Sequence, residues 1–63
     1  SPEDLILLKL IPGRTKDLAD VEAIVARHGG SLDKKYLRSW AEKIGDMAED
    51  MRILRQLKNL KAI

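Results

Sequence analysis

Apolar side chains recur along most of this chain at spacings of three and four residues, the period that places them on one face of an α-helix. The first regular face combines Leu18, Val21, Ile24 and Val25. Two later faces repeat the pattern: Tyr36, Leu37, Trp40, Ala41 and Ile44, and then Met47, Met51, Leu54, Leu57 and Leu60. The pattern predicts an all-α protein, a compact bundle of about four short helices over residues 2–11, 16–28, 34–44 and 47–61.

The first predicted helix lacks a polar face. Residues 5–11 are apolar except for Lys9, and a helix that is apolar all round is normally buried or contacts two partners at once. A chain this short has little material to cover every side, so we expect a neighbouring domain or a second copy of the chain to cover one face. Two interpretations of Lys9 stay open: its ammonium snorkels to solvent, or it points at an anion.

Residues typical of helix starts precede each predicted helix. Ser1 is suited to cap the first helix, and Pro2 to occupy its first position. Thr15 is the expected cap of the second helix, and Asp33 that of the third. The D-x-x-E segment at residues 46–49 resembles a capping box, which predicts that the last helix begins there.

Proline and glycine are expected to end the helices. Pro12 and Gly13 stop the first helix, because proline lacks the amide hydrogen that continues a helix. Gly29 suits the left-handed residue that often follows a helix, and Gly45 is expected to end the third helix.

Composition narrows the class of protein. The 63 residues suffice for one domain, and the absence of cysteine with a single histidine, His28, excludes disulfides, thiolate zinc sites and multi-histidine sites. A net charge of +2 does not by itself indicate a nucleic-acid binder. The only aromatic residues, Tyr36 and Trp40, are expected to anchor the core. No apolar run approaches the roughly 18 residues that span a bilayer, so a cytoplasmic location is the default.

Charged residues gather after the first helix. Arg14, Lys16, Asp17 and Asp20 follow the proline–glycine break, and Asp17 and Asp20 should share one face because they lie three positions apart. Acidic residues at a helix start, paired with neighbouring bases, are the ordinary interpretation. The functional alternative is a carboxylate that orients a base, a water or a metal-bound ligand beside a polyphosphate.

Basic residues recur at every third position of the last predicted helix: Arg52, Arg55, Lys58 and Lys61. A period of three drifts around a helix, so these residues form no straight stripe. We expect them on the solvated surface, with a contact to phosphate or to an acidic partner as the alternative.

The chemistry of an independent enzyme is missing from the chain. There is no glycine-rich phosphate loop and no nucleophile–histidine set, and little remains to line a catalytic pocket. The chain begins at Ser1 without an initiator methionine. We therefore expect residues 1–63 to be a single helical domain that forms part of a longer protein and is not catalytic alone.

Two segments carry a resemblance to a known family. The run K-L-I-P-G-R-T-K-D-L-A-D-V from Lys9 to Val21 resembles the later motifs of the minimal nucleotidyltransferase superfamily, most closely its AbiEii-type branch of toxin-like proteins and their uncharacterised relatives. The residues from Leu32 to Gly45 resemble that branch's L-D-x-x-Y-L-x-x-W-A-x-x-x-G ending. In that family, a catalytic sheet domain precedes these helices, so the resemblance implies that residues 1–63 are the C-terminal part of a longer protein.

The resemblance implies a role for each matching residue. Lys9 would correspond to the family lysine that approaches the nucleotide phosphates, and Asp17 to the aspartate of the later helical motif. Arg14, Lys16 and Asp20 would support it. The function implied is a helical accessory portion of a nucleotidyltransferase-like protein, whose whole form binds Mg²⁺ and a nucleoside triphosphate. Its partner would be the upstream catalytic domain of the same protein or a second copy of the chain.

The chain also departs from the family pattern. Pro12 stands where a small residue is expected, and the G-S turn and the D-x-[DE] metal-binding carboxylates are absent from these residues. Because those carboxylates hold the magnesium ions of nucleotidyl transfer, the chain itself has no predicted metal ligand or catalytic residue.

Two other functions stay open. The apolar first helix favours a small helical interaction or dimerisation module. A helix-turn-helix-like DNA binder is the further alternative, with Lys34, Lys35 and Arg38 at the start of its recognition helix.

Overall fold

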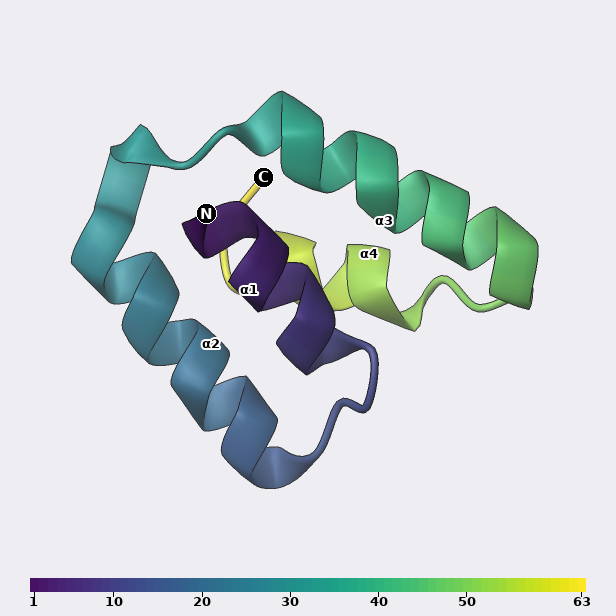
Figure 1. Ribbon diagram of the computed structural model, residues 1–63, viewed down its shortest axis with the longest axis horizontal. Helices are drawn as coiled ribbons and strands as arrows, with labels where there is room; N and C mark the ends of the chain where they lie inside the picture. The colour runs from purple at the N-terminus through teal and green to yellow at the C-terminus, as the bar shows by residue number, and fades with distance from the viewer.

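The computed structural model describes residues 1–63 and contains four α-helices (Figure 1). They are α1 (Pro2–Leu10), α2 (Thr15–His28), α3 (Lys34–Ala48) and α4 (Arg52–Asn59), with a short 3-10 turn, η1 (Gly29–Ser31), between α2 and α3. There is no strand. The predicted all-α bundle of short helices is therefore confirmed.

The helices are arranged around α1. Figure 1 shows α2 and α3 as two arms of an open angle joined by η1, with α1 lying between them. α1 packs against both arms, and α4 packs against α3. The short α1–α2 connection reverses the chain, so the end of α1 lies beside the start of α2 (Figure 1).

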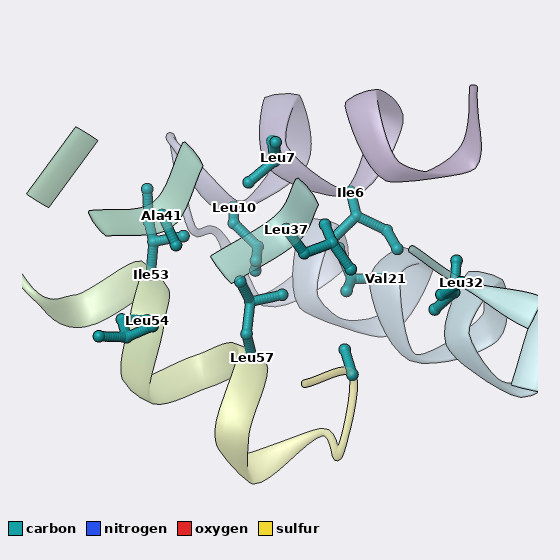
Figure 2. Packing of buried hydrophobic residues seen from close by; sticks show 11 residues of the cluster. Ile6, Leu7, Leu10, Val21, Leu32, Leu37, Ala41, Ile53, Leu54 and Leu57 are labelled. Carbon is teal, nitrogen blue, oxygen red and sulfur yellow. The ribbon is translucent and has the colours of Figure 1, made fainter. Parts of the chain in front are cut away.

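The core draws residues from all four helices. Its eleven buried apolar residues are Ile6, Leu7, Leu10, Val21, Leu32, Leu37, Ala41, Ile53, Leu54, Leu57 and Ala62. In Figure 2, Leu57 points from α4 toward Leu10 of α1 and Leu37 of α3. These three side chains are fully buried, so the contact joins three helices that lie far apart in the sequence.

Two of the predicted helix starts are confirmed. The Ser1 hydroxyl accepts a hydrogen bond from the backbone N–H of Asp4 at 3.2 Å, and Pro2 is the first helical residue. The Asp33 carboxylate accepts from the backbone N–H of Tyr36 at 3.0 Å. Each contact satisfies a backbone donor that the helix itself leaves unpaired.

The start of α2 differs from the prediction. Arg14, not Thr15, is the capping residue, because the Arg14 carbonyl already accepts the backbone N–H of Leu18 at 2.9 Å. Thr15 is thus the first helical residue, and no side chain caps the backbone here. At the other end, Gly29 has φ of 52° and ψ of −128°. That positive φ suits glycine, although it is not the left-handed helical conformation that we expected.

The boundary between α3 and α4 was predicted wrongly. Gly45 does not end α3, which continues to Ala48 and closes at Glu49 with a left-handed φ of 53°. Gly45 is buried inside the helix, where an added Cβ would lie 2.7 Å from the Met51 sulfur. An internal glycine costs a helix about 1 kcal/mol relative to alanine. The close approach of Met51 gives a reason for glycine at this position, because a larger side chain would collide with it.

Because α3 continues to Ala48, α4 begins later than predicted. The segment 46–49 forms no capping box, because most of it belongs to the last turn of α3. α4 begins instead at Arg52, whose backbone N–H donates to the Asp50 carboxylate at 2.9 Å. The last predicted helix is therefore shortened at both ends.

Three residues expected in the core lie at the surface. The exposed fraction is 87% for Met47, 43% for Met51 and 42% for Trp40. The buried face of α3 consists of Leu37, Ala41 and Gly45. Trp40 and Met47 lie outside that narrow face of α3, and Met51 precedes α4 as its capping residue. The helical period alone therefore did not predict the burial of these side chains.

We expect Leu57→Ala to lower the free energy of unfolding by about 2–5 kcal/mol, because it opens a cavity where three helices meet. Met47→Ala should change it by less than about 0.5 kcal/mol, because the side chain is exposed. Urea denaturation followed by circular dichroism measures both values.

If Leu57→Ala does not fold, Ile53→Val offers a smaller change in the same core, with an expected cost of about 0.5–1.5 kcal/mol. Equal costs for Met47→Ala and Leu57→Ala would contradict this packing.

Candidate functional site

Four of the five predicted site residues form two ion pairs beside the α1–α2 turn, and we call them the charged cluster: Lys9 with Asp20, and Arg14 with Asp17. Lys9 lies in the last turn of α1, Arg14 caps α2, Asp17 lies in the first turn of α2 and Asp20 in the next turn. The fifth residue, Lys16, is exposed and forms no ion pair or side-chain hydrogen bond. The chain reversal is what brings Lys9 to the residues of α2.

The Lys9 ammonium points at an anion, and that anion is Asp20 of the same chain. The Nζ–Oδ2 distance is 2.9 Å, with side chains 29% and 53% exposed. The Lys9 ammonium is therefore paired within the chain, while its side chain stays partly exposed. Such surface ion pairs contribute about 0–1 kcal/mol to stability.

Arg14 and Asp17 form the more buried pair of the cluster. Arg14 Nε donates to Asp17 Oδ2 at 2.7 Å, and its Nη2 approaches Oδ1 at 3.5 Å. The Asp17 side chain is only 5% exposed, whereas that of Arg14 is 63% exposed. The hydrogen bond from Arg14 lowers the pKa of Asp17, and the same contact raises the pKa of Arg14.

Asp17 and Asp20 therefore have different surroundings despite their spacing of three. Asp17 is buried and held by a base on its own helix, while Asp20 is exposed and holds a base on α1. The spacing in the sequence predicted that the two carboxylates share one face of the helix. It did not predict that only the Asp17 carboxylate is buried.

Arg52 supports the turn, a role that the sequence pattern did not reveal. Its Nη2 donates to the carbonyl of Ile11 at 2.7 Å and approaches that of Leu10 at 3.4 Å. Its guanidinium thus satisfies carbonyls at the negative end of α1. Gly13 has φ of 63°, and a Cβ there would lie 2.6 Å from Arg52 Nη1. The prediction that placed Arg52 on the solvated surface is wrong, because its side chain is half-buried.

A second feature, which we call the α1–α3 groove, lies on another side of α1. It is an open hollow of about 350 Å³ lined by Asp4, Leu7, Leu8, Ile11, Tyr36, Trp40 and Ile44. At one end, the Tyr36 hydroxyl donates a hydrogen bond to the Asp4 carboxylate. This bond lowers the pKa of Asp4 and raises the pKa of Tyr36. The groove is otherwise apolar.

Three further observations bear on the class of protein. No three His, Cys, Asp or Glu side chains come together in a way that could hold a metal ion. None of the helices combines the length and apolar character needed to cross a membrane. No family model, curated protein or solved structure matches the chain. The assignment of a function therefore depends on the residues themselves.

We expect acid to destabilise the protein partly through Asp17. A lowered pKa means that the folded state binds fewer protons than the unfolded state, so this contribution is present above about pH 4 and is lost as pH falls further. Asp17→Asn should flatten the dependence of the melting temperature on pH between about pH 4 and pH 2. Thermal melts across this range measure the effect.

Arg14→Gln supplies the matched test, because it removes the cation that lowers the Asp17 pKa. It should flatten the same part of the curve, and the double variant should flatten it no further. Some acid dependence should remain in all three, because the pKa values of Glu3 and Asp4 are also lowered. An unchanged slope in both single variants would exclude Asp17 as a source.

We expect Lys9→Met to retain the fold. The substitution keeps an apolar stem of similar length and removes one exposed ion pair, so the free energy of unfolding should fall by less than about 1 kcal/mol. Urea denaturation beside Lys16→Met, which has no ion pair to lose, isolates this contribution. A loss several times larger would mean that the Lys9–Asp20 pair is structural.

Proposed function

We propose that this chain is a helical accessory portion of a nucleotidyltransferase-like protein and contributes phosphate-contacting side chains from its charged cluster. The observation that carries the proposal is the pair of neighbouring ion pairs, Lys9–Asp20 and Arg14–Asp17, beside the α1–α2 turn. These residues belong to the ordered series that resembles the family motifs. The proposal includes the cytoplasmic location expected from the sequence.

The geometry of the cluster suits a ligand that carries several negative charges. Lys9 is paired only with a half-exposed carboxylate, so a polyphosphate can compete with Asp20 for its ammonium. Arg14 uses Nε and Nη2 on Asp17, while Nη1 has no protein partner. Guanidinium and ammonium groups form strong, charge-assisted hydrogen bonds with phosphate oxygens.

The buried carboxylate has a positioning role in this proposal. Asp17 lies on the first turn of α2 and fixes the direction of the Arg14 guanidinium. Exposed Lys16 adds positive charge beside the turn without a fixed partner. The cluster would thus hold a phosphate tail through Lys9 and Arg14, with Asp17 orienting the arginine.

Magnesium would have to be held by another part of such a protein. No group of acidic side chains in this chain fits a metal ion. Bound magnesium neutralises the charge that develops on the phosphates during nucleotidyl transfer. The residues of this chain would bind and orient the phosphates.

The test uses the full product of the gene that encodes this chain. Its coding sequence upstream of Ser1 should contain a G-S turn followed by D-x-[DE]. Calorimetric titration with ATP, GTP, CTP and UTP in the presence of Mg²⁺ should then show binding of at least one nucleotide. Lys9→Met should weaken that binding by about tenfold or more, because a charge-assisted contact is lost.

Lys35→Met is the matched control, because Lys35 is exposed on α3 and lies outside the charged cluster. It should leave the nucleotide affinity unchanged. Unaltered affinity in Lys9→Met, or no nucleotide binding by the wild-type protein, would contradict the proposal. Thermal melts of both variants separate loss of binding from loss of folding.

The α1–α3 groove favours a second candidate function, a helical protein-interaction module. Leu8 and Ile11 beside this hollow are 65% and 49% exposed. Grooves between two helices that carry apolar side chains are common docking sites for a third helix. This function uses a different side of α1 from the charged cluster, so the two proposals are compatible.

A further inference from the structure

We propose that two copies of the chain associate through the α1–α3 groove, related by a two-fold axis. The inference deepens the second proposed function, on which it depends, by naming the partner. It does not depend on nucleotide binding. Three properties of the surface support it. Exposed apolar side chains are concentrated there, the surface has both a projecting side chain and a hollow, and charged residues lie at its two ends.

Exposed apolar side chains are concentrated on two neighbouring helices. The large hydrophobic residues at the surface are Leu5, Leu8, Ile11, Trp40, Met47 and Met51. The first three belong to α1 and its C-cap, the next two to α3, and none lies within α2 or α4. Three of them, Leu8, Ile11 and Trp40, line the α1–α3 groove. Exposed apolar side chains gathered in this way mark interaction surfaces.

The same surface contains both a hollow and a side chain suited to fill one. The groove offers about 350 Å³, and Leu8 on its edge is 65% exposed. In a two-fold dimer the same patch contacts itself, so it must present both complementary shapes. Leu8 of each copy can therefore enter the hollow of the other, against Trp40.

The charges along the groove are complementary only when the second copy is reversed. Asp4 lies at the end where α1 and α3 begin, because it accepts the hydrogen bond from Tyr36. Further along α3, the Lys43 ammonium lies 4.9 Å from the centroid of the Trp40 ring. A two-fold axis across the groove reverses the second copy, which brings Asp4 of each copy toward Lys43 of the other. Opposite charges then meet at both ends.

A dimer interface would also favour folding of this chain. A standard specific interface buries about 800 Å² on each partner. That is about a fifth of the 4194 Å² surface of the chain. Burial on this scale would support a 63-residue fold that is small for independent stability.

Sedimentation equilibrium across about 1 μM to 1 mM chain tests the proposal, since this range covers weak and moderate dimers. The wild-type chain should change from monomer to dimer within it. Leu8→Lys should weaken association by about tenfold or more, because it places a charge in an apolar interface. Ala26→Lys is the matched control, because it introduces the same charge at an exposed position of α2.

A charge exchange between two variants tests the orientation. Lys43→Glu alone and Asp4→Lys alone should each dimerise more weakly than wild type, because like charges then meet at both ends. An equimolar mixture should form a heterodimer more tightly than either variant associates with itself. Circular dichroism of each variant verifies that it remains folded.

The results of these experiments distinguish association with a second copy from binding of a different partner. A wild-type chain that stays monomeric to 1 mM, or a dimer unaffected by Leu8→Lys, would overturn the proposal. In the monomeric case, the dye 1-anilinonaphthalene-8-sulfonate reports whether the groove is open. Dye binding lost in Leu8→Lys would retain the interaction module with a different partner, whereas no dye binding by wild type would remove the module as well.

Discussion

Packing of α2 and α3 against α1 is the constraint on which the rest of this structure depends. From Leu5 onward, α1 is apolar at every position except Lys9, but its neighbours cover only the side that carries Ile6, Leu7 and Leu10. This side forms the centre of the core, where Leu57 of α4 also enters. The uncovered side leaves Leu8 and Ile11 exposed. A single packing arrangement thus produces both the core and the apolar groove.

The same arrangement determines where the charges lie. Because α2 runs back alongside α1, Lys9 reaches Asp20 across the two helices, and the Arg14–Asp17 pair forms at the reversal. Arg52 holds this reversal from α4 by binding the last carbonyls of α1. The charged cluster therefore joins α1 to α2, and Arg52 connects α4 to the same turn.

The charged cluster and the groove have different chemical characters. In the cluster, each base already has a carboxylate partner, so an external anion must compete with the protein for Lys9. In the groove, apolar side chains have no covering partner, and burial from water favours association directly. Residues 8 and 9 are consecutive, and the helix turns about 100° between them. One short helix can therefore serve both surfaces.

The sequence by itself determined the features that depend on local chemistry. Helical period located the four helices, and Ser1, Pro2 and Asp33 marked two helix starts, because capping involves residues within one turn. The acids after the first helix were expected to pair with neighbouring bases, as Asp17 does with Arg14, and the resemblance added Lys9 to this group. The Lys9–Asp20 contact was not predicted, because it depends on how two helices pack.

Only the tertiary structure decided which side chains are buried and which glycine ends a helix. Gly45 lies inside α3, where Met51 approaches it too closely for a larger side chain, a contact that the helical period does not encode. Trp40 and Met47 have the spacing of core residues, yet α3 buries only a narrow face of small and medium side chains. The sequence pattern did not distinguish Arg52 from the other bases of the last helix. In the fold, its guanidinium binds a carbonyl at the end of α1. Periodicity gives a helix its faces, but the neighbouring helices decide how much of each face is covered.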